Sequence, residues 1–218
     1  MAFGGLGLSK MRIAGTMVNA PHTAGRAQVA GSAFALSLRL QALRAARKAF
    51  PVARMQLLVI RHGIAEDPSS VVTGLDDSGP PLSKEGKQMM KRVAAGLREL
   101  VNEIDVIGAS PLLRAQQTAQ IVAKAYDDLP IVTVEDLLPD SDPPALMNWL
   151  RQHSTDNVVA IVGHQPNLGL VVTWLMSGVK ASRVALTKGG TCLLEFSSSV
   201  SPGNGTLQWL LTPSGPRR

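Results

Sequence analysis

A chain of 218 residues is long enough for one sizeable hydrophobic core with a short appendage. Its formal net charge of +6 comes from residues 1–54, which hold eight of the 22 basic residues and none of the 16 acidic ones, so the charge does not indicate a nucleic-acid-binding core. Its only cysteine, Cys192, excludes an internal disulfide, and no run of about 20 apolar residues suggests a membrane span.

Residues 1–54 form a basic, acid-free leader that we expect to lie outside the folded domain, which spans residues 55–218. The stretch from 29 to 50 has a basic, amphipathic, helical pattern typical of organelle transit peptides. Met55 immediately precedes an apolar run, so residues 1–54 could instead lie upstream of the true start. A helix that lies on a membrane surface is a third possibility. The predicted location is cytoplasmic, or the interior of an organelle if the leader is a transit peptide.

The first half of the domain alternates strands with helices. An apolar run over 55–60 predicts a buried strand, and Ser83 can cap a helix that extends to about Asn102. A second strand is expected over 104–110. A second helix should follow over 111–126, with Ser110 as its cap and a proline at its first position.

The second half continues this alternation and ends in a hairpin. Strands are expected over 131–135 and 157–163, and helices over 143–153 and 166–176. Two strands that flank a turn-rich segment, 191–196 and 206–211, indicate an antiparallel hairpin. This order predicts an α/β fold, a three-layer α/β/α sandwich around a mostly parallel sheet.

Polar side chains follow three of these strands at their carboxyl ends. Arg61 and His62 end the first strand, Ser110 ends the second with Arg114 one turn further on, and His164 ends the fourth. Ligands of open α/β sheets bind at this edge, and arginines and helix N-termini suit phosphate. The four histidines lack the spacing of a metal site, so we expect neither a metal nor another cofactor.

Three motifs in this order, "RHG", "SPLLRAQQTA" and "VGHQPN", resemble those of the histidine phosphatase superfamily, which has the phosphoglycerate-mutase-like fold. The short core and the ending "GNGTLQWLLTP" resemble the SixA branch of phosphohistidine phosphatases. The resemblance implies that His62 is the nucleophile, that Arg61 and Arg114 clamp the phosphoryl oxygens, and that His164 donates to them. Ser110 could add a hydrogen bond to the substrate, although a role in capping alone is the simpler interpretation.

The general acid is the open question of this site. Many members of the superfamily use a carboxylic acid near the third strand, where this chain has Glu135, Asp136, Asp140 and Asp142. Asp142 is our candidate, although its position beside Pro143 also suits a helix cap. Phosphohistidine has an imidazole leaving group with a reference pKa of about 6.5, which needs little protonation, so the lack of a clear acid mildly favours this substrate.

The segment after "RHG" also differs from that of phosphoglycerate mutases. Residues 64–67 are Ile, Ala, Glu and Asp, where mutases usually carry a hydroxyl-bearing residue and then an asparagine. We therefore expect a metal-independent phosphatase that acts on phosphohistidine of a histidine-phosphotransfer protein through a covalent phosphohistidine intermediate. The chain is expected to be monomeric, without nucleic-acid or membrane partners of its core. A small-molecule phosphomonoesterase and a phosphate-binding module without turnover are the alternatives.

Overall fold

The computed structural model describes residues 55–67, 79–153 and 158–213. The expectations for the leader over 1–54 therefore lie outside the described residues. Six strands form one sheet in the order β3-β2-β4-β1-β5-β6. The strands are β1 (Met55–Arg61), β2 (Val106–Ala109), β3 (Ile131–Thr133), β4 (Val158–Gly163), β5 (Thr191–Phe196) and β6 (Thr206–Leu211).

The sheet is mostly parallel, as predicted. The pairs β2–β3, β2–β4 and β1–β4 are parallel, whereas β5 runs antiparallel to both β1 and β6. The hairpin predicted from the two late strands is thus confirmed. The third strand has three residues instead of five, because Glu135 already begins a short 3-10 helix, η2 (Glu135–Leu137).

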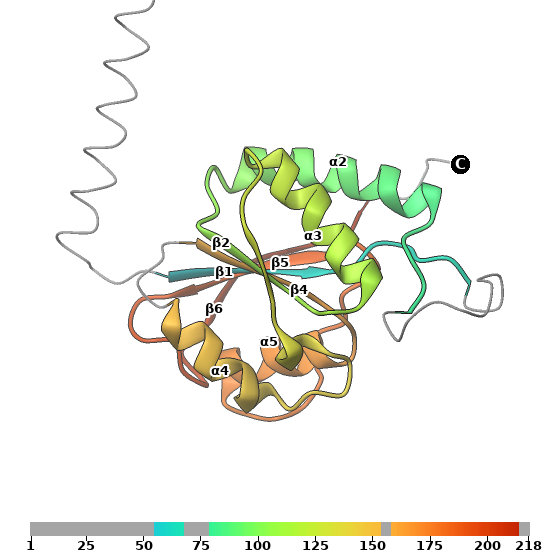
Figure 1. Cartoon of the computed structure of the whole chain (residues 1–218). Helices are drawn as coiled ribbons and strands as arrows, with labels where there is room; N and C mark the ends of the chain where they lie inside the picture. The colour runs from blue at the N-terminus through green and yellow to red at the C-terminus, as the bar shows by residue number, and fades with distance from the viewer. Residues whose placement is uncertain (1–54, 68–78, 154–157, 214–218) are drawn as a thin grey trace, which may run out of the picture. The chain divides into compact units, whose positions relative to one another are not determined.

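Helices cover both faces of the sheet and make the predicted three-layer sandwich (Figure 1). On one face lie α2 (Lys84–Leu100) and α3 (Leu113–Ala125), and on the other lie α4 (Pro143–Gln152) and α5 (Asn167–Ser177). Alternate side chains of β1 enter two separate cores, Leu57 and Val59 on the α4–α5 side and Leu58 and Ile60 on the α2–α3 side. This explains why the strand is apolar without interruption.

The helix boundaries follow local chemistry, with one correction. Ser83 caps α2 as predicted, since its hydroxyl accepts a hydrogen bond from the Gly86 N–H at 3.0 Å. Ser110 does not cap α3. That helix begins at Leu113 with Leu112 at the cap position. The Ser110 hydroxyl lies 2.9 Å from the side chain of His164.

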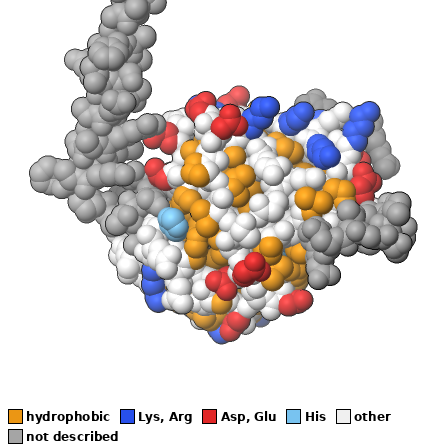
Figure 2. Space-filling model, in the orientation of Figure 1, with side chains coloured by type: hydrophobic (Ala, Val, Ile, Leu, Met, Phe, Trp, Pro, Cys, Tyr) orange, Lys and Arg blue, Asp and Glu red, His pale blue; other side chains and the backbone are white. Residues whose placement is uncertain are grey.

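The outer faces of the helices are charged. Five exposed basic side chains lie on α2: Lys84, Lys87, Lys91, Arg92 and Arg98. Figure 2 shows basic groups gathered along this edge of the molecule. The buried face of the same helix carries Met89, Met90, Ala94 and Leu97. Within the described residues, no helix is long and apolar enough to cross a membrane.

Candidate active site

The register of three neighbouring strands brings three polar residues to one edge of the sheet. β2 ends at Ala109, β4 at Gly163 and β1 at Arg61, so Ser110, His164 and His62 each follow a strand end. The backbone N–H of His62 donates to the carbonyl of Gly163 at 3.1 Å, and that of Ser110 donates to the carbonyl of Val162 at 2.9 Å. These bonds continue the pairing of the parallel strands by one residue. The three residues therefore lie side by side, just beyond the carboxyl ends of the strands.

His62 is buried, with 7% of its surface exposed. Its Nδ1 lies 2.7 Å from the carbonyl oxygen of Gly63, which only accepts hydrogen bonds. Burial, together with the nearby charges of Arg114, Arg61 and Lys188, lowers the pKa of His62 to about 4, although the bond to Gly63 opposes this shift. The imidazole is therefore neutral near pH 7, its proton is on Nδ1, and Nε2 carries a free electron pair.

His164 is the second buried imidazole of the site, with 2% of its surface exposed. Its ring centroid lies 4.9 Å from that of His62, with an angle of 49° between the ring planes. Its Nε2 lies 2.9 Å from the hydroxyl oxygen of Ser110. Burial lowers the pKa of His164 to about 3, and the charges of His62, Arg114 and Arg61 act in the same direction. This ring is also neutral near pH 7.

Two guanidinium groups complete the cluster. Arg61 donates from Nη1 to the carbonyl of Leu186 at 2.6 Å, while its Nε is buried and has no hydrogen-bond partner among the described residues. Arg114 lies in the first turn of α3. Burial lowers the pKa of both arginines, yet guanidinium groups stay charged in proteins. The site thus combines two permanent cations with two neutral imidazoles, an arrangement suited to a phosphoryl group.

Asp142 is placed differently from this cluster. It occupies the cap position of α4 but makes no side-chain cap hydrogen bond. Its carboxylate instead pairs with the ammonium group of Lys180 at 3.0 Å, and 64% of the Asp142 side chain is exposed. The ion pair with Lys180 holds this carboxylate at the surface. A role as general acid stays a prediction.

Two polar residues that follow Arg114 on α3 and make hydrogen bonds to neighbouring loops were missed by the sequence analysis. The buried hydroxyl of Thr118 accepts from the N–H of Gly63 at 3.1 Å and donates to the carbonyl of Arg114 at 2.8 Å. The side-chain oxygen of Gln117 accepts from the N–H of Leu82 at 2.7 Å. Both could have been found, because positions three and four after Arg114 share its face of the helix.

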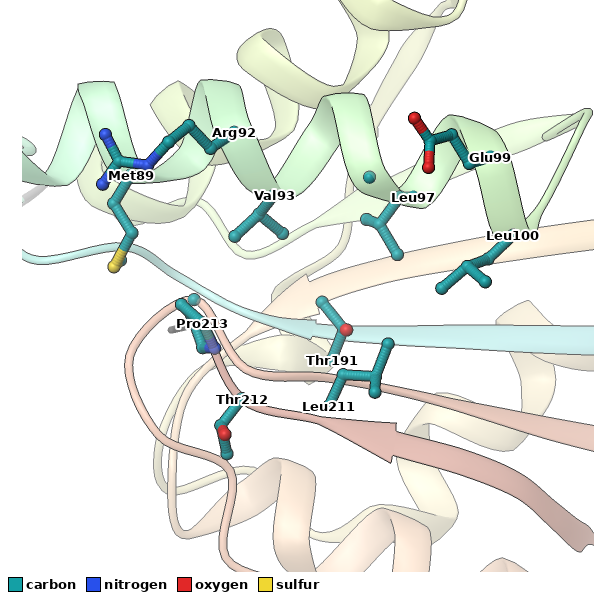
Figure 3. Close-up of a pocket in the computed structure, with 12 residues that line it drawn as sticks. Met89, Arg92, Val93, Leu97, Glu99, Leu100, Thr191, Leu211, Thr212 and Pro213 are labelled. Carbon is teal, nitrogen blue, oxygen red and sulfur yellow. The ribbon is translucent and has the colours of Figure 1, made fainter. Parts of the chain in front are cut away.

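A groove elsewhere in the molecule has a different character. It has a volume of about 370 Å³ and lies between α2 and the ends of β5 and β6 (Figure 3). Met89, Val93, Leu97 and Leu211 are among its apolar lining residues, and none of the four cluster residues lines it. The polar side chains of Arg92, Glu99, Thr191 and Thr212 also line this groove.

Among the described residues, histidine, cysteine and carboxylate side chains form no group of three that could hold a metal ion. Cys192 is buried in β5, where burial raises its pKa to about 12. The thiol is thus a small packed side chain in the core.

Comparisons with known proteins indicate the family of the chain. The family model of the histidine phosphatase superfamily (branch 1) matches residues 57–138. An uncharacterized protein of Picosynechococcus is 34% identical over 138 residues, which cover 62% of this chain and 82% of the relative. The phosphohistidine phosphatase SixA of Escherichia coli is 28% identical over 165 residues, which cover 73% of this chain and 94% of SixA.

Solved structures give the same result at the level of the fold. A structure of the protein histidine phosphatase SixA complexed with tungstate aligns with a TM-score of 0.61 and 27% identity, over 73% of this chain and 97% of SixA. A structure described as a SixA protein of Agrobacterium tumefaciens aligns with a TM-score of 0.60. The chain therefore belongs to the histidine phosphatase superfamily, and it is a phosphatase that resembles the SixA proteins in sequence and fold.

Proposed function

We propose that this phosphatase removes the phosphoryl group from phosphohistidine on a signalling protein of the histidine-phosphotransfer type. The observation that carries the proposal is the free Nε2 of His62 beside His164 and two arginines. The similarity to SixA proteins supports the choice of substrate. A monomeric, cytoplasmic enzyme that acts on a folded protein partner is part of the same proposal.

In this mechanism His62 is the nucleophile. Its Nε2 electron pair attacks phosphorus in line with the phosphorus–nitrogen bond of the substrate, that bond breaks, and the substrate imidazole leaves. Arg61 and Arg114 neutralise the charge on the phosphoryl oxygens during the transfer, and His164 donates to one of them. Water then attacks the phosphorus on His62, the new bond to Nε2 breaks, and inorganic phosphate is released.

The imidazole leaving group of phosphohistidine suits a site in which no general acid has been identified. An imidazole has a reference pKa of about 6.5, so it departs with much less help from a proton donor than an alkoxide does. The carboxylate that we considered as an acid, Asp142, pairs with Lys180 at the surface. Phosphohistidine therefore makes the smallest demand on the residues that surround His62.

The test is a comparison of substrates under identical conditions. Phosphate release is measured from a phosphohistidine-bearing transfer domain, from p-nitrophenyl phosphate and from common sugar phosphates. The proposal predicts the highest kcat/KM for the phosphohistidine protein. Preference for a sugar phosphate would make the enzyme a small-molecule phosphomonoesterase. Binding without turnover would make it a phosphate-binding module, and either result would overturn the proposal.

The Asp142→Asn variant provides a second criterion in the same assay. If Asp142 is the general acid for ester substrates, this variant loses phosphomonoesterase activity and keeps activity on phosphohistidine, because only the alkoxide leaving group needs the proton. An unchanged profile for both kinds of substrate would remove Asp142 from the site. Loss of phosphohistidine activity would contradict the leaving-group argument.

A further inference from the structure

We infer that Ser110 is a positioning residue whose hydroxyl donates to Nε2 of His164 and so keeps the proton of that imidazole on Nδ1. The inference rests on the proposed function, which gives His164 its role as a donor to the phosphoryl group. The position of the proton itself is a property of the protein without substrate. The inference replaces the direct contact with substrate, and the role as helix cap, that the sequence suggested for Ser110.

The contacts of the Ser110 hydroxyl favour this direction of donation. The oxygen lies 3.4 Å from the backbone nitrogen of Leu112 and 2.9 Å from Nε2 of His164, and the residue is fully buried. The N–H of Leu112 only donates, so the Ser110 oxygen accepts there. Its own O–H is then available to Nε2. In the opposite arrangement, Nε2–H would donate to Ser110, and the buried O–H would have to find a different acceptor.

The second ring nitrogen supports the same tautomer. Nδ1 of His164 is buried and has no hydrogen-bond partner among the described residues, although the ring lies 4.9 Å from the nucleophile candidate His62. A buried polar atom without a partner is costly, unless a ligand satisfies it. With its proton on Nδ1, His164 offers a donor to a phosphoryl oxygen. If the proton were instead on Nε2, Nδ1 would present an electron pair to the phosphoryl oxygen and repel it.

The order of the strands explains why a serine can do this. β4 lies between β2 and β1, so His164 stands between Ser110 on one side and His62 on the other. The carbonyl of Ser110 also accepts from the side-chain amide of Gln116 at 2.8 Å, which holds the backbone of Ser110 in place. Two hydrogen bonds in series thus connect the Leu112 N–H to the Ser110 hydroxyl and the Ser110 hydroxyl to His164, whose Nδ1 faces the proposed phosphate site.

Nitrogen-15 NMR of the histidine side chains in the full chain tests this directly. The resting enzyme is expected to show His164 as a neutral ring with Nδ1 protonated and Nε2 unprotonated, and Ser110→Ala should lose this single tautomer. The same variant should bind tungstate, used as a phosphate-shaped probe, about tenfold more weakly, because one oriented donor is lost. Ser110→Thr keeps a hydroxyl and should restore the tautomer.

Tyr126→Phe is the matched control, since it removes another buried hydroxyl. Tyr126 follows the last residue of α3, and its hydroxyl donates to the carbonyl of Val101, just after α2, at 2.8 Å. It should leave the His164 signals and tungstate binding unchanged. Nε2 protonation in the wild-type protein would overturn the inference, even if Ser110→Ala failed to fold. So would unchanged signals and affinity in Ser110→Ala. Because no phosphohistidine substrate enters these measurements, their outcome is separate from that of the substrate comparison.

Discussion

His62 and His164 are neutral in the folded protein because they are buried beside cations, and this has a consequence for stability. Their pKa values are about 4 and about 3, both below the ordinary value of about 6.5 for a histidine in an unfolded chain. The unfolded chain therefore binds more protons than the folded one when the pH falls below about 6.5. The contribution of the two neutral rings to stability is fully present above that pH. It is lost progressively as the pH falls toward about 4 for His62 and about 3 for His164.

We expect the midpoint of urea unfolding to fall between about pH 7 and about pH 5, partly because of these two residues. The double variant His62→Gln, His164→Gln cannot take up these protons, so its midpoint should fall by less over the same interval. An equal fall in the wild-type protein and the double variant would show that the two imidazoles are not held neutral.

Single residues also mark the limit of the sequence analysis. The gathering of Arg61, His62 and His164 at strand ends could be predicted, because a parallel sheet brings such ends to one edge. Arg114 could be added to this group because it lies in the helix that follows the end of β2. The role of Ser110 could not, since a serine before a proline has the local pattern of a helix cap. Its contact with His164 joins residues 54 positions apart, and no local pattern contains that information.

At the scale of elements, Thr118 connects α3 to the loop that carries the first motif. Its hydroxyl is the partner of the buried N–H of Gly63, directly after His62. α2 approaches the same loop closely at Gly86, where a side chain would collide with the carbonyl of Ile64. The position of His62 therefore depends on contacts from two helices that cover one face of the sheet.

We expect Thr118→Val to destabilise the protein by about 1–3 kcal/mol, because it leaves the N–H of Gly63 buried without a partner. The value of kcat/KM should fall as well, since the loop of His62 loses a fixed support. Thr118→Ser keeps the hydroxyl and is the control that should retain most of both properties. Urea denaturation and phosphatase assays measure the two effects. Wild-type stability in Thr118→Val would contradict this role for the hydroxyl.

Boundaries of elements were less predictable than their existence. Continuous apolar runs indicated β1 and β4 because both strands are buried on two faces. The edge strand β3 keeps only three residues because just three of its positions pair with β2. The start of α3 was predicted at residue 111, but the helix begins at Leu113. Ser110 and Pro111 have the pattern of a helix start, although the Ser110 hydroxyl contacts His164 instead.

At the scale of the whole molecule, the described strands and helices and both hydrophobic cores lie between Met55 and Pro213. The basic excess of the chain belongs instead to residues 1–54. We therefore propose that residues 55–218 form the catalytic domain and that the leader is not needed for the chemistry.

A chain that begins at Met55 should keep the thermal midpoint and the kcat/KM of the full chain for the same phosphohistidine substrate. Calorimetry and the phosphate-release assay measure these two quantities. Failure of the shorter chain to fold, or a loss of activity in a shorter chain that is folded, would show that the leader contributes to the domain.

The most direct test of the account is to trap the phosphoryl group on the enzyme. The full chain is mixed with a phosphohistidine-bearing transfer domain, quenched at high pH, where phosphohistidine survives and acyl phosphates do not, and digested for mass spectrometry. We predict a phosphorylated peptide that contains His62, absent from His62→Ala and lost from the wild-type protein as the reaction proceeds. Phosphorylation at a different residue, or full turnover by His62→Ala, would contradict the account.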